Sequence, residues 1–111
     1  MSNKKLQVII CGVPFRIKLE KTTNFNDSTL GEVVVKDTEI RIKDEMSPEM
    51  KQSVLIHEWL HAVLLMNHFY DEGSDEKLID CLKNALYMAN FRVPVQVLNE
   101  QRTETKSSKS N

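Results

Sequence analysis

Several classes of protein are excluded by what this chain of 111 residues lacks. Its 15 basic and 16 acidic residues leave a net charge of −1, so it carries no electrostatic footprint for nucleic acid or an anionic membrane surface. The longest apolar run, Val54 to Met66, is broken by His57, Glu58 and His61 and cannot span a bilayer. We therefore expect neither nucleic acid nor a membrane as a direct partner.

Cysteine and targeting signals are also scarce. The two cysteines, Cys11 and Cys81, lie far apart and match no metal or redox spacing, so we expect free thiols. The apolar segment Leu6–Ile10 is too short for the core of a signal peptide. These features together predict a cytoplasmic protein.

The length and composition predict one domain. With 41% apolar and 28% charged residues, the chain resembles an ordinary globular protein, and we assign residues 1–98 to a single domain. Residues 99–111 contain no apolar side chain, so this segment cannot offset its ordering entropy and is predicted to be a disordered polar tail.

The first half of the chain has the pattern of β-strands. Two apolar or alternating runs, 6–11 and 15–20, are predicted to pair through a Gly12–Pro14 turn, and the polar segment 21–30 is predicted to be a loop. Two further runs, 31–36 and 39–43, predict a hairpin closed by a tight turn at residues 37–38.

The second half predicts two helices. Ser47 and Pro48 form a typical helix start, and an apolar pattern covering most of the circumference predicts a central helix from Pro48 to residue 67 or 68. Ser74 or Asp75 is expected to cap a second helix over residues 75–91. The sequence thus predicts an α+β domain, with a small antiparallel sheet of about four strands followed by two packed helices.

The pentapeptide His57-Glu58-Trp59-Leu60-His61 is the most informative stretch of the sequence. Residues four apart lie on one face of a helix, so the two imidazoles can take two corners of a zinc tetrahedron. Glu58 is rotated off that line, where it can act as general base on a water molecule. A single histidine on an apolar helix is more often a core residue whose hydrogen bonds are satisfied. Burying two histidines and a glutamate together without a partner such as a metal is costly.

A third ligand is expected at the start of the second helix. Glu76 and Asp80 are again four residues apart, so one carboxylate can bind the metal while the other accepts a hydrogen bond from a histidine. We favour Glu76 as the ligand, with Asp80 and Glu72 as alternatives. Taken alone, each of these carboxylates would be read as a solvated surface group.

The pattern His57-Glu58-x-x-His61 followed by Glu76-x-x-x-Asp80 resembles the gluzincin metallopeptidases. The strand-rich front half is similar to small phage or mobile-element proteins of the ImmA/IrrE-like kind. This resemblance implies a minimal zincin-like domain that binds Zn²⁺ through a helix glutamate supported by an aspartate, with Asp75 near the second histidine. Only fourteen residues separate His61 from Glu76, fewer than in large gluzincins.

The resemblance also implies a function. It suggests hydrolysis of a peptide or protein substrate, such as a transcriptional regulator, which would add as a strand along the edge of residues 39–43. Tyr87, or Tyr70, could donate to the oxyanion, although a tyrosine in a satisfied core site is the simpler interpretation. His68 could line the cleft or simply end its helix. The alternative function is a non-catalytic, zinc-stabilised regulatory or protein-binding module.

Overall fold

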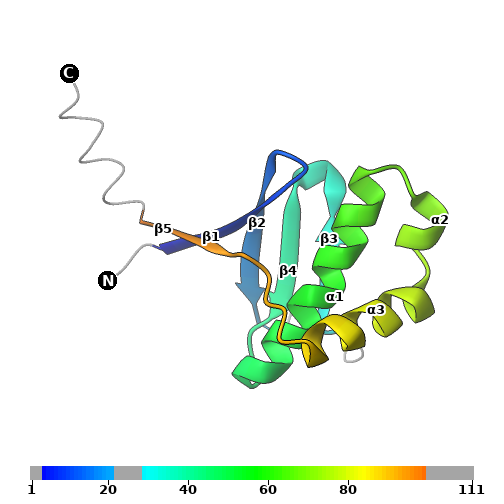
Figure 1. Ribbon diagram of the computed structural model, residues 1–111. Helices are drawn as coiled ribbons and strands as arrows, with labels where there is room; N and C mark the ends of the chain where they lie inside the picture. The colour runs from blue at the N-terminus through cyan, green and yellow to red at the C-terminus, as the bar shows by residue number, and fades with distance from the viewer. Residues whose placement is uncertain (1–3, 22–28, 100–111) are drawn as a thin grey trace.

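The computed structural model describes residues 4–21 and 29–99 of the chain. The elements, in chain order, are β1 (Lys4–Ile10), β2 (Val13–Glu20), β3 (Gly31–Val34), the 3₁₀ helix η2 (Val35–Asp37), β4 (Glu39–Lys43), α1 (Pro48–Met66), α2 (Tyr70–Gly73), α3 (Glu76–Met88) and β5 (Gln96–Asn99). The fold is α+β, as predicted (Figure 1).

The five strands form one mixed sheet in the order β3-β4-β2-β1-β5. The prediction of an antiparallel sheet is wrong at one position, because β2 and β4 run parallel, with Ile17 opposite Ile40. Alternation along a strand specifies which side chains are buried, and it is satisfied equally by either direction of the neighbouring strand. The β3–β4 hairpin therefore docks on β2 with β4 inside the sheet and β3 at its edge.

A fifth strand lies at the opposite edge of the sheet. β5 pairs antiparallel with β1, with Leu6 opposite Val97, so the predicted tail begins one residue too early, at Asn99. Such a short polar-ended segment becomes a strand because the open edge of β1 offers it main-chain partners. Residues 100–111 of that predicted tail, and residues 22–28 of the predicted loop, lie outside the described residues.

Both hairpins end differently from the sequence expectation. The first turns at Cys11 and Gly12, whose φ angles of 52° and 81° are those of a two-residue turn with positive φ at both positions. In the second, β3 stops at Val34 and a 3₁₀ turn leads to Thr38, which has φ of 50°. The pairing of each hairpin was predicted correctly and the turns only in part, since the first turn starts at Cys11 and the second at Val35.

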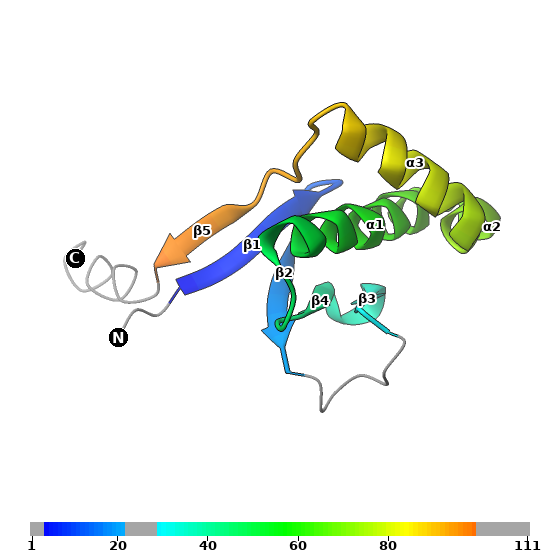
Figure 2. The same cartoon turned by 90° about the horizontal axis from the view of Figure 1, so that it is seen from below.

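Helix α1 begins as predicted and is the central element of the fold. Ser47 caps it by accepting a hydrogen bond of 3.2 Å from the Met50 amide, and Pro48 occupies the first turn. One side of α1 packs on the sheet and another on α3, so α1 lies between the two (Figure 2). The buried apolar core is drawn from both layers: Val8, Ile10, Phe15, Ile17, Ile40, Ile42, Val54, Leu55, Ile56, Leu60, Ala62, Ile79 and Val93.

The second predicted helix is shorter than expected. Asp75 caps α3, since its carboxylate accepts from the amides of Lys77 and Leu78 at 3.1 Å. The helix ends at Met88, before Asn90, whose φ of 67° is incompatible with further α-helix. The chain then returns through residues 91–95 to the sheet.

Two expectations from composition can be compared with the described part of the chain. No helix there is long and apolar enough to cross a membrane. Cys11 and Cys81 are both exposed and free.

The position of α1 against the sheet generates a stability prediction. Replacing the fully buried Ile56 with alanine should lower the free energy of unfolding by about 2–5 kcal/mol, because apolar contacts are lost and a cavity remains. The matched change at Ile9, which is 43% exposed, should cost less than about 1 kcal/mol. Urea unfolding of both variants measures the difference, and equal losses would contradict the assigned core.

Candidate metal centre

Two histidines of α1 meet at the start of α3. His57 and His61 lie one helical turn apart, and their Nε2 atoms approach to 3.1 Å. The two rings are tilted edge to face, with centroids 4.8 Å apart, so both Nε2 atoms converge on one point. The i, i+4 spacing therefore produces the expected pair.

Glu76 completes a triangle with these histidines. Its Oε1 lies 3.0 Å from Nε2 of His57, and its Oε2 lies 3.3 Å from Nε2 of His61. When one ligand atom is taken from each residue, all three lie within 4.8 Å of one another. Ligands bound 2.0–2.1 Å from zinc at tetrahedral corners are ~3.3 Å apart, and the Nε2–Nε2 separation and the approach of each Glu76 oxygen to one histidine are close to this value.

The other nitrogen of each histidine faces a hydrogen-bond acceptor. Nδ1 of His57 lies 2.9 Å from Oδ1 of Asp80, and Nδ1 of His61 lies 2.6 Å from the carbonyl oxygen of Gly73. A carboxylate and a carbonyl can only accept, so both Nδ1 atoms carry a proton and donate. In a neutral imidazole with its proton on Nδ1, Nε2 is unprotonated and its lone pair is available. This is the tautomer that binds a metal through Nε2.

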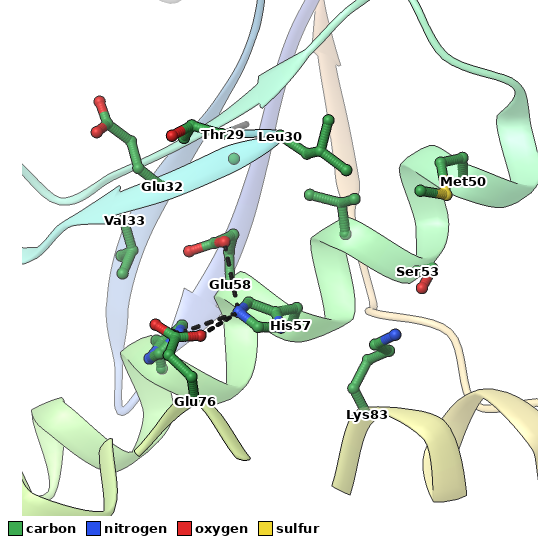
Figure 3. Close-up of a pocket in the computed structure, with 13 residues that line it drawn as sticks. Thr29, Leu30, Glu32, Val33, Met50, Ser53, His57, Glu58, Glu76 and Lys83 are labelled. Atoms are coloured by element: carbon green, nitrogen blue, oxygen red, sulfur yellow. Dashed lines mark hydrogen bonds and ion pairs between the residues drawn. The ribbon is translucent and has the colours of Figure 1, made fainter. Parts of the chain in front are cut away.

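The three side chains therefore form a group that could hold a cation. Two imidazole lone pairs and a carboxylate point at one another across about 3 Å, as drawn in Figure 3 for His57 and Glu76. A positive charge between these groups would be stabilised by all three, and the exposed side of Glu76 leaves that position open to solvent. The residues present fit Zn²⁺, which prefers nitrogen and carboxylate ligands in this number and geometry.

The remaining acidic candidates take different places. Asp80 lies behind the His57 ring, in the supporting position that the resemblance implied. Asp75 caps α3, and the partner of the His61 Nδ1 is instead the Gly73 main chain. Glu72 is exposed in α2 and does not belong to the group of described residues that could hold a metal.

Glu58 is buried beside the triangle. Its side chain is 8% exposed, and its Oε2 lies 3.9 Å from Nε2 of His57. Burial is the largest influence on this carboxyl group and raises its pKa to about 7, an effect that Glu76 and Glu32 reinforce and His61 opposes. A metal ion beside it would add positive charge and lower this pKa again.

The edge strand β3 closes over Glu58 at Gly31. A Cβ atom at this position would lie 2.8 Å from Cγ1 of Val54 and 3.2 Å from Cγ of Glu58. Only a residue without a side chain therefore allows β3 to pack this closely on α1. This contact contributes to the burial of Glu58.

A cleft of about 530 Å³ opens in front of the three candidate ligands (Figure 3). β3 forms one wall, while α1 and α3 form the others. The lining residues are Thr29, Leu30, Gly31, Glu32, Val33, Met50, Ser53, Val54, His57, Glu58, His61, Glu76 and Lys83.

The aromatic candidates do not line this cleft. Tyr87 is eleven residues beyond Glu76, about 16 Å along α3, and its ring packs under the guanidinium of Arg92 at 4.7 Å. Tyr70 is 59% exposed, and its hydroxyl lies 2.7 Å from Nδ1 of His68. The geometry therefore leaves Tyr87, Tyr70 and His68 away from the candidate metal ligands.

Sequence reasoning missed several residues of the site. Ser53 and Lys83 could have been found, because they lie four residues before His57 and seven after Glu76, at helical spacings that share a face. Gly31 and the Gly73 carbonyl carry no such signal, since each meets the site through tertiary packing.

No protein-family model, curated protein or solved structure matches the chain, so the site is interpreted from its own geometry.

The different positions of Glu76 and Asp80 generate a prediction for zinc binding. Glu76→Gln should weaken zinc binding by more than about 100-fold, because it removes a charged ligand. Asp80→Asn should weaken it only about 10–100-fold, because it alters the support of one imidazole. Competition with a fluorescent chelator measures both. Glu72→Gln is the matched control and should bind zinc as tightly as the unaltered protein does. A larger loss of zinc affinity in Asp80→Asn than in Glu76→Gln would exchange the roles of the two residues.

The burial of Glu58 generates a prediction for the zinc-free protein. Its folded-state pKa of about 7 lies above the ordinary 4.5, so the folded state holds this proton more tightly than the unfolded state. The contribution of Glu58 to stability should therefore be greatest at low pH and fall as pH rises from about 4.5 through 7. Between pH 5 and 8, the free energy of unfolding of the unaltered protein should fall by about 2–3 kcal/mol more than that of Glu58→Gln. Urea unfolding in chelator measures this, and parallel pH profiles would contradict it.

Proposed function

We propose that the protein is a zinc-dependent metallopeptidase, built on a minimal zincin-like domain, in which Glu58 is the general base. One observation carries this proposal: two imidazole nitrogens and a carboxylate converge to within 3.0–3.3 Å of one another beside a buried carboxyl group. A third ligand from protein with a fourth position left open is typical of catalytic zinc sites, whereas structural sites are usually closed by four protein ligands.

The residues around the centre have separate roles in this mechanism. His57, His61 and Glu76 would hold the metal, and Asp80 and the Gly73 carbonyl would keep the imidazoles in the correct tautomer. A zinc ion bound there supplies a Lewis acid that polarises the scissile carbonyl and makes water more acidic.

Glu58 would move the proton. Its carboxylate takes a proton from the attacking water and passes it to the nitrogen of the departing amine. Burial raises the pKa of Glu58 and a bound metal ion would lower it, and a base whose pKa lies near the working pH can accept and then release a proton. Glu58 lies 3.9 Å from Nε2 of His57, is not one of the three candidate ligands, and lines the same cleft.

An extended peptide would enter along β3. The prediction that residues 39–43 form the substrate edge is wrong, because β4 lies inside the sheet between β3 and β2. β3 is the edge strand, and three of its residues, Gly31, Glu32 and Val33, line the cleft. A substrate strand could form main-chain hydrogen bonds along this edge while its scissile bond lies over the candidate metal ligands.

The expected substrate is an unfolded or extended segment of a peptide or protein. The cleft is bordered by the edge strand β3, to which a chain in extended conformation can add through main-chain hydrogen bonds. A transcriptional regulator as the natural substrate rests on the sequence resemblance and stays a prediction.

Glu58→Gln tests the function without removing a ligand. The variant should bind zinc as tightly as the unaltered protein within a few-fold, while hydrolysis of unfolded protein substrate such as reduced casein should fall at least about 10³-fold. Zinc content by elemental analysis and product formation by mass spectrometry give the two readouts. If unaltered, zinc-loaded protein cleaves no more than Glu58→Gln does, the non-catalytic zinc-stabilised module is the correct interpretation.

A further inference from the structure

The two ends of the cleft differ in charge. Beside β3, the carboxylate of Glu32 is paired with Arg41 at 2.9 Å, so its negative charge is balanced by a neighbour. At the other end lies Lys83 of α3, the one basic side chain among the described residues that line the cleft. The cleft therefore offers an approaching ligand an ammonium group at one end only.

Lys83 lies on the same helix as the candidate ligand Glu76 and lines the same cleft. Figure 3 shows Lys83 reaching from α3 toward His57, on the side away from Glu76 and near Ser53 of α1. No ion pair is recorded for Lys83 with any residue of the described segments 4–21 and 29–99. The nearest acidic residue on its helix, Asp80, is one turn away and is hydrogen-bonded to His57 at 2.9 Å.

The surroundings of Lys83 favour a charged partner. The side chain is half-buried, and Leu30, Met50 and Val54 contribute apolar surface to the same cleft. A carboxylate bound there would be partly shielded from water, which strengthens a charge-assisted hydrogen bond compared with one at an open surface. The Ser53 hydroxyl provides a second donor on the opposite wall.

Helix geometry sets the spacing of such a partner. Lys83 follows Glu76 by seven residues, which corresponds to about 10 Å along α3. An extended peptide advances about 3.3 Å per residue, so a group two or three residues from the scissile bond would reach Lys83.

We propose that Lys83 is a specificity-determining residue that binds a carboxylate of the substrate two or three residues from the scissile bond, with Ser53 as an additional donor. The inference deepens the proposed function, because it places the scissile bond at the His57–His61–Glu76 centre. The carboxylate belongs either to an acidic side chain or to the C-terminus of the substrate.

Binding of small zinc ligands tests the carboxylate site without requiring hydrolysis. The probes are linear hydroxamic acids of increasing chain length that end in a carboxylate, each compared with its neutral methyl ester. The hydroxamate occupies the metal and the far end samples the cleft. With zinc-loaded full-length protein, the carboxylate should bind about tenfold more tightly than its ester at one intermediate length, as measured by calorimetry. No preference at any length overturns the proposal.

Variants of Lys83 assign the preference to its charge. Lys83→Ala should remove the advantage of the carboxylate over the ester, Lys83→Arg should retain most of it, and Lys83→Glu should reverse it. The matched control is Lys77→Ala, which removes an exposed lysine of the same helix outside the cleft and should behave as the unaltered protein. A preference that survives Lys83→Ala overturns the proposal.

A cleavage experiment separates the two sources of the carboxylate and the two proposals. In a mixture of peptides of known sequence, cleavage two or three residues from Asp or Glu indicates a side chain, and cleavage at a fixed distance from the C-terminus indicates the terminal carboxylate. Either preference should be lost in Lys83→Ala. If the hydroxamates bind more tightly with a carboxylate than with an ester but no peptide is cleaved, the carboxylate site stands and the metallopeptidase proposal fails. If peptides are cleaved with no preference for an acidic residue or for the C-terminus, the carboxylate site alone is overturned.

Discussion

Helix α1 has to bury apolar and polar groups on the same short stretch of chain. Leu55 and Ile56 pack into the core, while Glu58 and His61, only two to five residues further on, are also buried. Polar groups removed from water need partners, and α3 and the turn before it supply them for both histidines. The place of α3 is therefore determined by polar as well as by apolar contacts, since Ile79 is its one fully buried side chain.

The sheet contributes to the site through its edge. β3 is the outermost strand and approaches α1 closely at Gly31, so that the same segment limits access of water to Glu58 and forms one wall of the cleft. A strand in the interior of the sheet could not do both, because both of its edges would be occupied by neighbours. The position of β3 in the strand order thus connects the architecture of the sheet with the electrostatics of the site.

Local features of the sequence could be predicted, and features that depend on tertiary pairing could not. The spacing of His57 and His61, and the capping residue Ser47, act within one helix and are visible in any reading of the chain. The parallel pairing of β2 with β4 and the addition of β5 depend on how separate segments meet. Alternation along a strand does not depend on the direction of the neighbouring strand. A main-chain acceptor, such as the Gly73 carbonyl, is present at every residue type and therefore leaves no signal in the sequence.

The hydrogen bond from His61 to the Gly73 carbonyl links the imidazole to helix packing. No substitution at position 73 can delete a main-chain oxygen, but a Cβ atom there would lie 2.9 Å from Cδ2 of Leu65, on the last turn of α1. Any change in how α1 and α2 fit together is therefore transmitted to the proton on Nδ1 of His61. The Nδ1 chemical shift of this candidate ligand therefore reports on the contact between the two helices.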